Sequence, residues 1–183
     1  MEPANNILTL LVQKAVKGNA SAQAQLYHQF SKAMFHICLR MTDHKNLAED
    51  VLQDAFILAF KNLHQLKEGA QFGGWLKRIV VNECIRQTKQ KWDWQEWNEA
   101  QHELADESEE AWWKTVNIEM VYRQIKELPE GCKQVFNLYV FEDYSHKEIA
   151  RFLDISESTS KSQYHRARKI LREKINNQMA LNG

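Results

Sequence analysis

The sequence predicts an all-α protein with two small helical domains joined by an acidic flexible linker. Three observations predict this class. Only 2 prolines and 6 glycines occur in 183 residues, so few positions interrupt a helix. Apolar residues recur at steps of three and four along most of the chain, which is the spacing of one helix face. Residues 92–113 contain eight acidic residues and no lysine or arginine, a composition typical of a connector.

The first half of the chain predicts a four-helix domain over residues 1–91. The expected helices cover residues 7–17, 21–41, 46–66 and 75–90. Gly18 ends the first helix, and residues 67–74, which contain three glycines, separate the third from the fourth. In the fourth helix we expect Trp75 and Ile79 to face the core.

The second half predicts four shorter helices in a domain over residues 114–183. They cover residues 116–128, 130–141, 145–153 and 156–177. Pro129 separates the first two. Ser145 followed by Glu148 has the pattern of a capping box, and Ser156 is placed to cap the last helix.

The last two helices have the pattern of a helix-turn-helix between Tyr144 and Leu171. Apolar residues bracket a tight turn at Asp154, which tolerates a left-handed backbone, and the small Ala150 allows close helix packing. Five basic residues and no acidic one lie between Lys161 and Arg172. A solvated basic helix at the end of a bundle is the alternative, but turn, cap and small residue together favour a helix that enters the major groove of DNA.

The expected DNA contacts fall into two groups along this helix. The early positions, which we expect to be exposed and to face base edges, are Thr159, Lys161, Ser162, His165 and Arg166. The later positions, which we expect to hold the phosphate backbone, are Arg168, Lys169 and Arg172. The net charge of +0 conceals this basic character, because the eight acidic residues of 92–113 leave the rest of the chain at about +8.

Motifs in both halves resemble one family. Leu128-Pro129, residues 135–138 and residues 144–150 look like region 4 of the extracytoplasmic-function (ECF) group of sigma-70-type sigma factors. Residues 48–56 look like region 2.2, and residues 72–83 like regions 2.3 and 2.4. The resemblance implies that residues 1–91 form sigma region 2, residues 114–183 form sigma region 4, and residues 92–113 are the linker.

The resemblance also implies a function and partners. Such a protein binds core RNA polymerase, at a coiled coil of the largest subunit and at the flap, and directs it to promoter DNA. Region 2 opens the minus-10 element and region 4 reads the minus-35 element. The residues expected to bind core polymerase are Glu49, Asp50, Gln53 and Asp54. Those expected at the minus-10 element are Phe72, which would stack on a base, with Lys77, Arg78, Asn82 and Arg86.

Several residues of the last helix depart from the family pattern. Ser158, Ser160, Gln163 and Tyr164 stand where glycine, valine, arginine and leucine are usual. We expect Ser160, which replaces an apolar anchor, to alter the tilt of the helix. We expect Gln163 to weaken phosphate binding.

Other functions find less support in the sequence. A free-standing, dimeric regulator would use the same helix-turn-helix, but the N-terminal motifs argue against it. No phosphate loop, nucleophile motif or ligand cluster predicts an enzyme, a cofactor or a metal site. The alternatives for the acidic residues of 48–56 are charges that complement the helix dipole, or metal ligands. The three cysteines are expected to be buried, since they form no C-x-x-C pair.

Location and regulation follow from the same features. No apolar run approaches the ~20 residues that span a bilayer, and the start lacks a signal-like stretch, so we expect a cytoplasmic protein without membrane insertion. The resemblance leaves an anti-sigma partner open. Some of the five tryptophans of residues 92–113 are expected to pack on one or both domains, and the carboxylates of this segment to cover the DNA-binding faces of the free protein.

Overall fold

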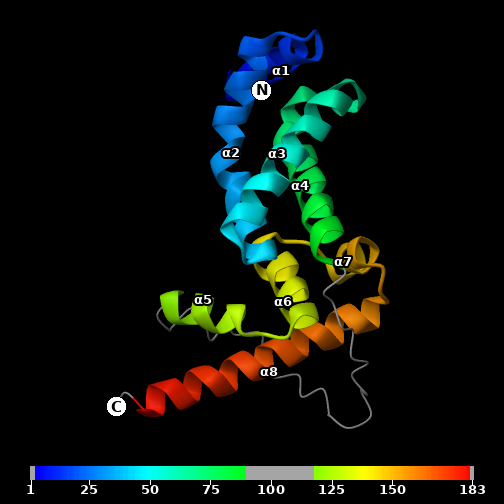
Figure 1. The fold of residues 1–183 in the computed structure, drawn as a ribbon. Coiled ribbons are helices and arrows are strands. Elements are labelled where there is room, and N and C mark those ends of the chain that lie inside the picture. Colours follow the sequence, from blue (N-terminus) through cyan, green and yellow to red (C-terminus); the bar gives the residue numbers. More distant parts are fainter. Residues whose placement is uncertain (1–2, 90–117, 182–183) are drawn as a thin grey trace. The chain divides into compact units, whose positions relative to one another are not determined.

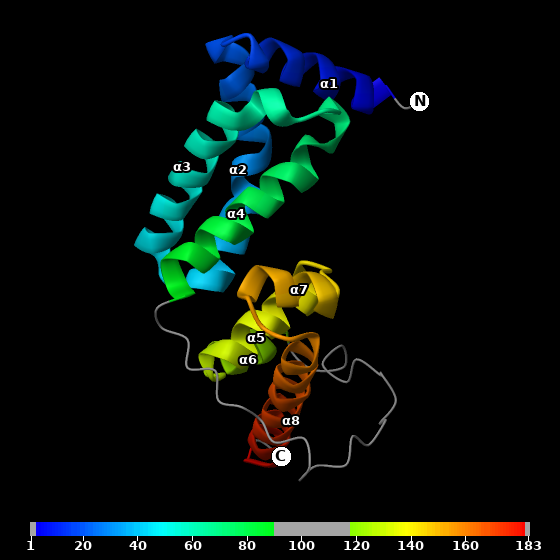
Figure 2. The ribbon, with the colours of Figure 1, turned by 90° about the vertical axis from the view of Figure 1, so that its right-hand side faces the viewer.

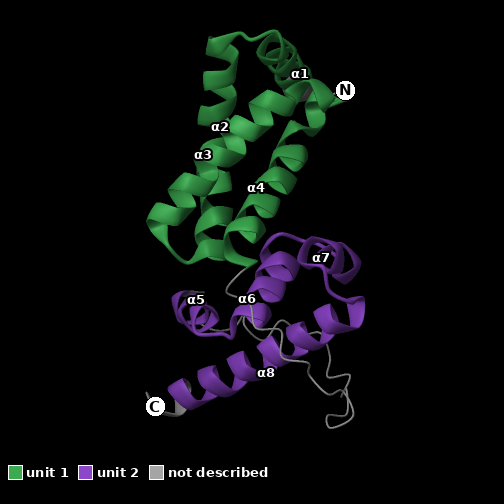
Figure 3. Cartoon of the chain, turned by 45° about the vertical axis from the view of Figure 1, so that its right-hand side comes forward, with its two compact units in different colours: residues 1–90 green, residues 91–183 purple. Residues whose placement is uncertain are grey.

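The computed structural model describes residues 3–89 and 118–181 as helices with short turns, and no strand occurs among these residues. The expected all-α class is confirmed. The chain divides into two compact units, residues 1–90 (unit 1) and residues 91–183 (unit 2), as Figure 3 shows. The expectations for residues 92–113 lie outside the described residues. None of the helices described is long and apolar enough to cross a membrane.

Unit 1 contains the four expected helices and two short 3-10 turns (Figure 1). They are α1 (Pro3–Val16), α2 (Ala20–Thr42), α3 (Lys45–Asn62), η1 (Leu63–Gln65), η2 (Gly69–Gln71) and α4 (Phe72–Thr88). The helices α2, α3 and α4 pack on one another, and α1 lies across one end of α2 and against η2 (Figure 2).

Three boundaries in unit 1 differ from the expectation by three or more residues. The helix α3 ends at Asn62 instead of residue 66, and the 3-10 turn η1 follows it. The helix α1 starts at Pro3, because proline is favoured in the first turn, where its missing N–H costs nothing. The helix α4 starts at Phe72 instead of residue 75, so Gly73 and Gly74 lie inside the helix and Gly69 is the one glycine left in the break. Gly69 explains the tight path of that break: an added Cβ would lie 2.9 Å from Cα of Thr9, so only glycine lets η2 approach α1 this closely.

Unit 2 is built around a long last helix. Its elements are α5 (Ile118–Lys126), α6 (Glu130–Phe136), the π-helical turn η6 (Asn137–Phe141), α7 (His146–Leu153) and α8 (Glu157–Leu181). The core joins α5, α6 and α8 through Val121, Ile125, Leu128, Cys132, Phe136, Ala167, Leu171 and Ile175. An ion pair between Lys174 and Glu127, 2.6 Å long, links the outer parts of α8 and α5.

The predicted caps of α7 and α8 are confirmed. The hydroxyl of Ser145 accepts a hydrogen bond from the backbone N–H of Glu148 (3.3 Å), and the Glu148 carboxylate accepts one from the Ser145 N–H (3.0 Å). Ser156 accepts one from the backbone N–H of Thr159 (2.9 Å). Asp154 has φ of 58°, the expected left-handed turn.

Candidate nucleic-acid interface

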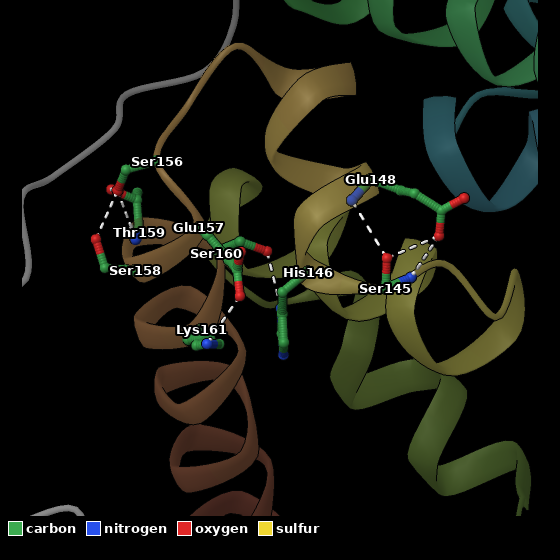
Figure 4. A network of polar contacts seen from close by, with 9 residues as sticks. All are labelled: Ser145, His146, Glu148, Ser156, Glu157, Ser158, Thr159, Ser160 and Lys161. Atoms are coloured by element: carbon green, nitrogen blue, oxygen red, sulfur yellow. Dashed lines mark hydrogen bonds and ion pairs between the residues drawn. The ribbon is translucent and has the colours of Figure 1, made fainter.

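The helices α7 and α8 form the predicted helix-turn-helix. Ile149 and Leu153 of α7 are buried, and the N–H of Ile155 bonds to the carbonyl of Ala150 (3.0 Å), which closes the turn. Because capping fixes the start of both helices, the angle between them is set within a few residues (Figure 4). The first two turns of α8 are thereby held in a defined direction.

Most of the predicted cations lie on the outer side of α8. Lys161, His165, Lys169 and Arg172 are exposed. Arg168 is half-buried, with its guanidinium 5.8 Å from the centre of the Tyr164 ring, where a cation–π contact restrains it. Lys161, Arg168, Lys169 and Arg172 therefore form a positively charged row at helical spacing along α8.

Three predicted residues occupy the flank of α8 instead. Thr159 and Arg166 are half-buried, and the Thr159 hydroxyl lies 2.7 Å from that of Ser156. Ser162 is 7% exposed, and its hydroxyl donates to the carbonyl of Thr159 (3.0 Å). The expectation that Ser162 is an exposed base-reading position is therefore wrong, because it lies beside the core-facing row of the helix.

The sequence pattern did not point to several charged residues of the same surface. Glu157, in the first turn of α8, forms an ion pair with Lys161 (2.9 Å). The hydrogen bond and charge of Lys161 lower the pKa of the Glu157 carboxyl. Lys147 and Arg151 are exposed one turn apart on α7, and this i, i+4 pair of cations was a signal available in the sequence.

Two of the four residues that depart from the family pattern, Ser160 and Gln163, point inward, whereas Ser158 is exposed. Ser160 is fully buried, and its hydroxyl lies 2.9 Å from Nδ1 of His146. Gln163 is 2% exposed and accepts a hydrogen bond from the Cys132 thiol (3.0 Å). The side chain of Gln163 faces the core, and the expectation that it weakens phosphate binding stays a prediction. Tyr164 packs on Tyr139, with ring centres 4.5 Å apart.

Burial perturbs the titration of several groups in this region. Burial, and then the charges of Lys161 and His165, lower the pKa of His146. Burial, and then the charge of Arg168, lower the pKa of His165. Burial raises the pKa of the Cys132 thiol to about 11. The three cysteines are all buried, as expected, and Cys132 is a neutral thiol and a poor nucleophile at neutral pH.

A second group of predicted residues lies on α4. Arg78, Asn82 and Arg86 are exposed at four-residue steps, and Lys77 beside them is half-buried. The guanidinium of Arg86 lies 2.6 Å from the Glu83 carboxylate and 3.8 Å from that of Asp54 on α3. This face of α4 therefore presents cations and an amide one helical turn apart.

The burial of Phe72 and Trp75 differs from what was expected of each. Phe72 is fully buried and packs edge-on against Phe30, with ring centres 5.1 Å apart. Its expected role of stacking on a base is wrong, because the ring is part of the core. Trp75, expected to be core, is half-buried, as is Ile79.

The residues predicted to bind core polymerase share one exposed face of α3. Glu49, Asp50, Gln53 and Asp54 are all exposed. Ile57, one turn further on, is 67% exposed, and sequence reasoning did not single it out. In the described part of the chain, no group of three or more His, Cys, Asp or Glu residues is placed to hold a metal ion. The face combines negative charge with an apolar side chain, which suits a protein partner.

Comparisons with known proteins identify the family. The Sigma-70 region 2 model matches residues 26–93, and the Sigma-70, region 4 model matches residues 118–171. The ECF RNA polymerase sigma factor SigW of Bacillus subtilis is 28% identical over 179 residues, covering 90% of this chain and 94% of SigW. The RNA polymerase sigma-H factor of Pseudomonas aeruginosa is 28% identical over 173 residues, covering 88% of this chain and 90% of that protein.

Solved structures share the fold. CnrH, solved in complex with the cytosolic domain of CnrY, has a TM-score of 0.56 at 22% identity, covering 93% of this chain and 97% of CnrH. The sigma factor RpoE of Bartonella quintana, solved with the anti-sigma factor NepR, has a TM-score of 0.55 at 19% identity, covering 84% of this chain and 96% of RpoE. With both region models matched in order, the chain belongs to the ECF group of sigma-70-type sigma factors, which direct promoter-specific transcription initiation with RNA polymerase.

Proposed function

We propose that unit 2 reads the minus-35 element with α8 in the major groove, while unit 1 engages the minus-10 element through α4 and core polymerase through α3. The observation that carries this proposal is the exposed basic row on α8, directly after a capped and tightly turned α7. A helix held in this way presents its first turns to base edges and its later turns to phosphates.

The contacts divide along α8. Lys161 and His165 lie early in the helix and face base edges, with Thr159 and Arg166 at the flank. The phosphate contacts come from Arg168, Lys169 and Arg172, and from Lys147 and Arg151 on the preceding helix. Glu157 takes part by holding the Lys161 ammonium until DNA competes for it.

At the minus-10 element, the exposed face of α4 supplies the contacts. Arg78, Asn82 and Arg86, with Lys77, bind phosphates and base edges of the opened strand. Trp75, which is half-buried beside them, is the aromatic ring that this surface offers to an unstacked base, in place of Phe72.

Core polymerase binds the acidic face of α3. Glu49, Asp50, Gln53 and Asp54 pair with a basic surface of the partner, and Ile57 supplies apolar contact. The protein acts in this assembly as a regulatory subunit without catalytic activity, in the cytoplasm where polymerase works. An anti-sigma factor is a further proposed partner, since the similar CnrH and RpoE structures are complexes of that kind.

Reconstituted transcription tests this function. The purified chain is added to bacterial core polymerase with a library of promoter fragments, and start sites are mapped. We expect start sites that core polymerase alone does not produce. Sequence-specific DNA binding without polymerase, together with no new start sites, would instead favour the free-standing regulator.

A matched pair of variants links the activity to α8. Lys161→Gln removes a cation of the proposed DNA surface, and Lys32→Gln removes an exposed cation of α2 in unit 1. Each substitution changes the net charge by one. The proposal requires that only Lys161→Gln reduces transcription from promoters with an intact minus-35 element.

A further inference from the structure

The contact between α7 and α8 contains a polar pair made of a buried serine and a half-buried histidine. Ser160 lies in the first turn of α8 after the cap and is fully buried. Its hydroxyl is 2.9 Å from Nδ1 of His146, the first residue of α7 (Figure 4). The two residues are 14 positions apart, so the bond joins the two helices of the helix-turn-helix and does not belong to either one.

Aromatic contacts fix the orientation of the His146 ring. The ring stacks on Tyr139 of η6, with centres 4.5 Å apart and planes 14° apart, and lies 5.7 Å from the Tyr164 ring of α8. Tyr139 and Tyr164 also contact each other at 4.5 Å. Because the ring is held on two sides, Nδ1 has one direction available, and that direction meets Ser160.

The Ser160 hydroxyl depends on this partner. A buried hydroxyl without a hydrogen bond is unfavourable. Without His146, the Ser160 hydroxyl would have to donate to a backbone carbonyl of the preceding turn of α8, a contact that bends helices. The hydrogen bond with Nδ1 of His146 directs the hydroxyl toward α7 instead.

We propose that His146 is a positioning residue for promoter recognition, which sets the rotation of α8 through Ser160. The consequence reaches the DNA surface directly, since Lys161 is the next residue and His165 lies one turn beyond it. A small rotation of the first turns of α8 moves both side chains relative to base edges. This inference rests on the proposed role of α8 at the minus-35 element.

A double-mutant cycle tests the pair. His146→Phe keeps a flat ring for the stack on Tyr139 but removes Nδ1, and Ser160→Ala removes the hydroxyl. Holoenzyme is assembled from each full-length variant, and transcription is measured on a promoter with an intact minus-35 element and on copies with single base changes in it. Selectivity is the ratio of transcription from the intact promoter to transcription from a mutated copy.

The expected pattern is a loss that is not additive. Each single variant leaves one polar atom of the contact without its partner and lowers selectivity about three- to tenfold, the range expected for one hydrogen bond. The double variant removes both atoms and loses no more than one single variant. His146→Asn, whose amide nitrogen or oxygen takes the place of Nδ1, retains more selectivity than His146→Phe.

Controls separate this role from general stability. The unfolding temperature of each variant is measured, and Ser162→Ala, two residues along α8, removes a nearly buried hydroxyl that bonds within its own helix. Multiplicative losses in the double variant, or losses that follow unfolding temperature, overturn the positioning role. Failure of the wild-type chain to discriminate minus-35 sequences at all overturns the proposed function of α8, and the inference with it.

Discussion

Lys169 offers a quantitative test of the DNA-facing side of α8. It is exposed and is one of three late cations, with Arg168 and Arg172, proposed to contact phosphates. Each phosphate that a cation neutralises changes the slope of log affinity against log salt concentration by about 0.9. Lys169→Gln should therefore reduce the slope by about 0.9. Between 50 and 200 mM salt, the ratio of wild-type to variant affinity should shrink about 3.5-fold.

The same helix provides the control. Lys174 lies five residues further on, and its ammonium is 2.6 Å from the carboxylate of Glu127, the residue after α5, away from the proposed DNA row. Lys174→Gln makes the same change of charge in the same helix and should leave the slope unaltered.

Binding of preformed holoenzyme to a duplex promoter fragment gives the measurement. Fluorescence anisotropy is followed at several salt concentrations, at low temperature to keep the strands paired. Contacts made by the polymerase subunits contribute equally to wild type and variants, so they cancel in the ratio. Parallel salt dependence for Lys169→Gln and wild type, or an equal slope change for Lys174→Gln, would refute the assignment of phosphate contacts to this row.

Four further outcomes are expected. Ser145→Ala removes the cap of α7 and should lower the free energy of unfolding by about 1 kcal/mol in urea titrations; an unchanged midpoint would contradict this. Leu171→Ala empties a fully buried position and should cost about 2 to 5 kcal/mol, and a cost below about 1 kcal/mol would argue against the described core. The pKa values of His146 and His165 lie below the ordinary 6.5, mainly through burial, so their contribution to stability is complete above pH 6.5 and is lost as pH falls through the lowered values. Urea unfolding midpoints measured at pH 7.5 and 5.5 check this, and the midpoint should be higher at pH 7.5. Substitution of both histidines should reduce the difference between the two midpoints, and a higher midpoint at pH 5.5 would contradict the prediction. Ile57→Glu alters a side chain that is 67% exposed, so it should weaken holoenzyme assembly in a competition assay while leaving the unfolding temperature unchanged.

The sequence was sufficient where a structure depends on neighbouring residues. The capping box needs only Ser145 and Glu148, three positions apart, and the left-handed turn needs only a residue such as Asp154 after an amphipathic helix. Helical spacing likewise located the eight main helices, because the apolar stripe that it reveals is the stripe that packs.

The two aromatic residues of α4 show where periodicity was insufficient. Placing the start of the helix at residue 75 made Trp75 the first inward residue. The helix begins three residues earlier, and Phe72, Leu76 and Val80, at steps of four, are fully buried. At about 100° per residue, Trp75 then lies about 60° to one side of Phe72, at the edge of the buried face. With the helix start placed three residues too late, Trp75 was taken for a core residue and the fully buried Phe72 was missed.

The departures at Ser160 and Gln163 show a different limit. When each position is considered alone, Ser160 lacks the apolar anchor that is usual there, and Gln163 lacks the usual cation. The fold supplies each with a partner: His146, 14 residues away, and Cys132, 31 residues away. Both partners lie on other helices, so the compensation depends on how α6, α7 and α8 pack, and no local pattern encodes it. It follows that positions 146 and 160 should change together among relatives, because valine at 160 removes the need for a polar group at 146, whereas serine at 160 creates it.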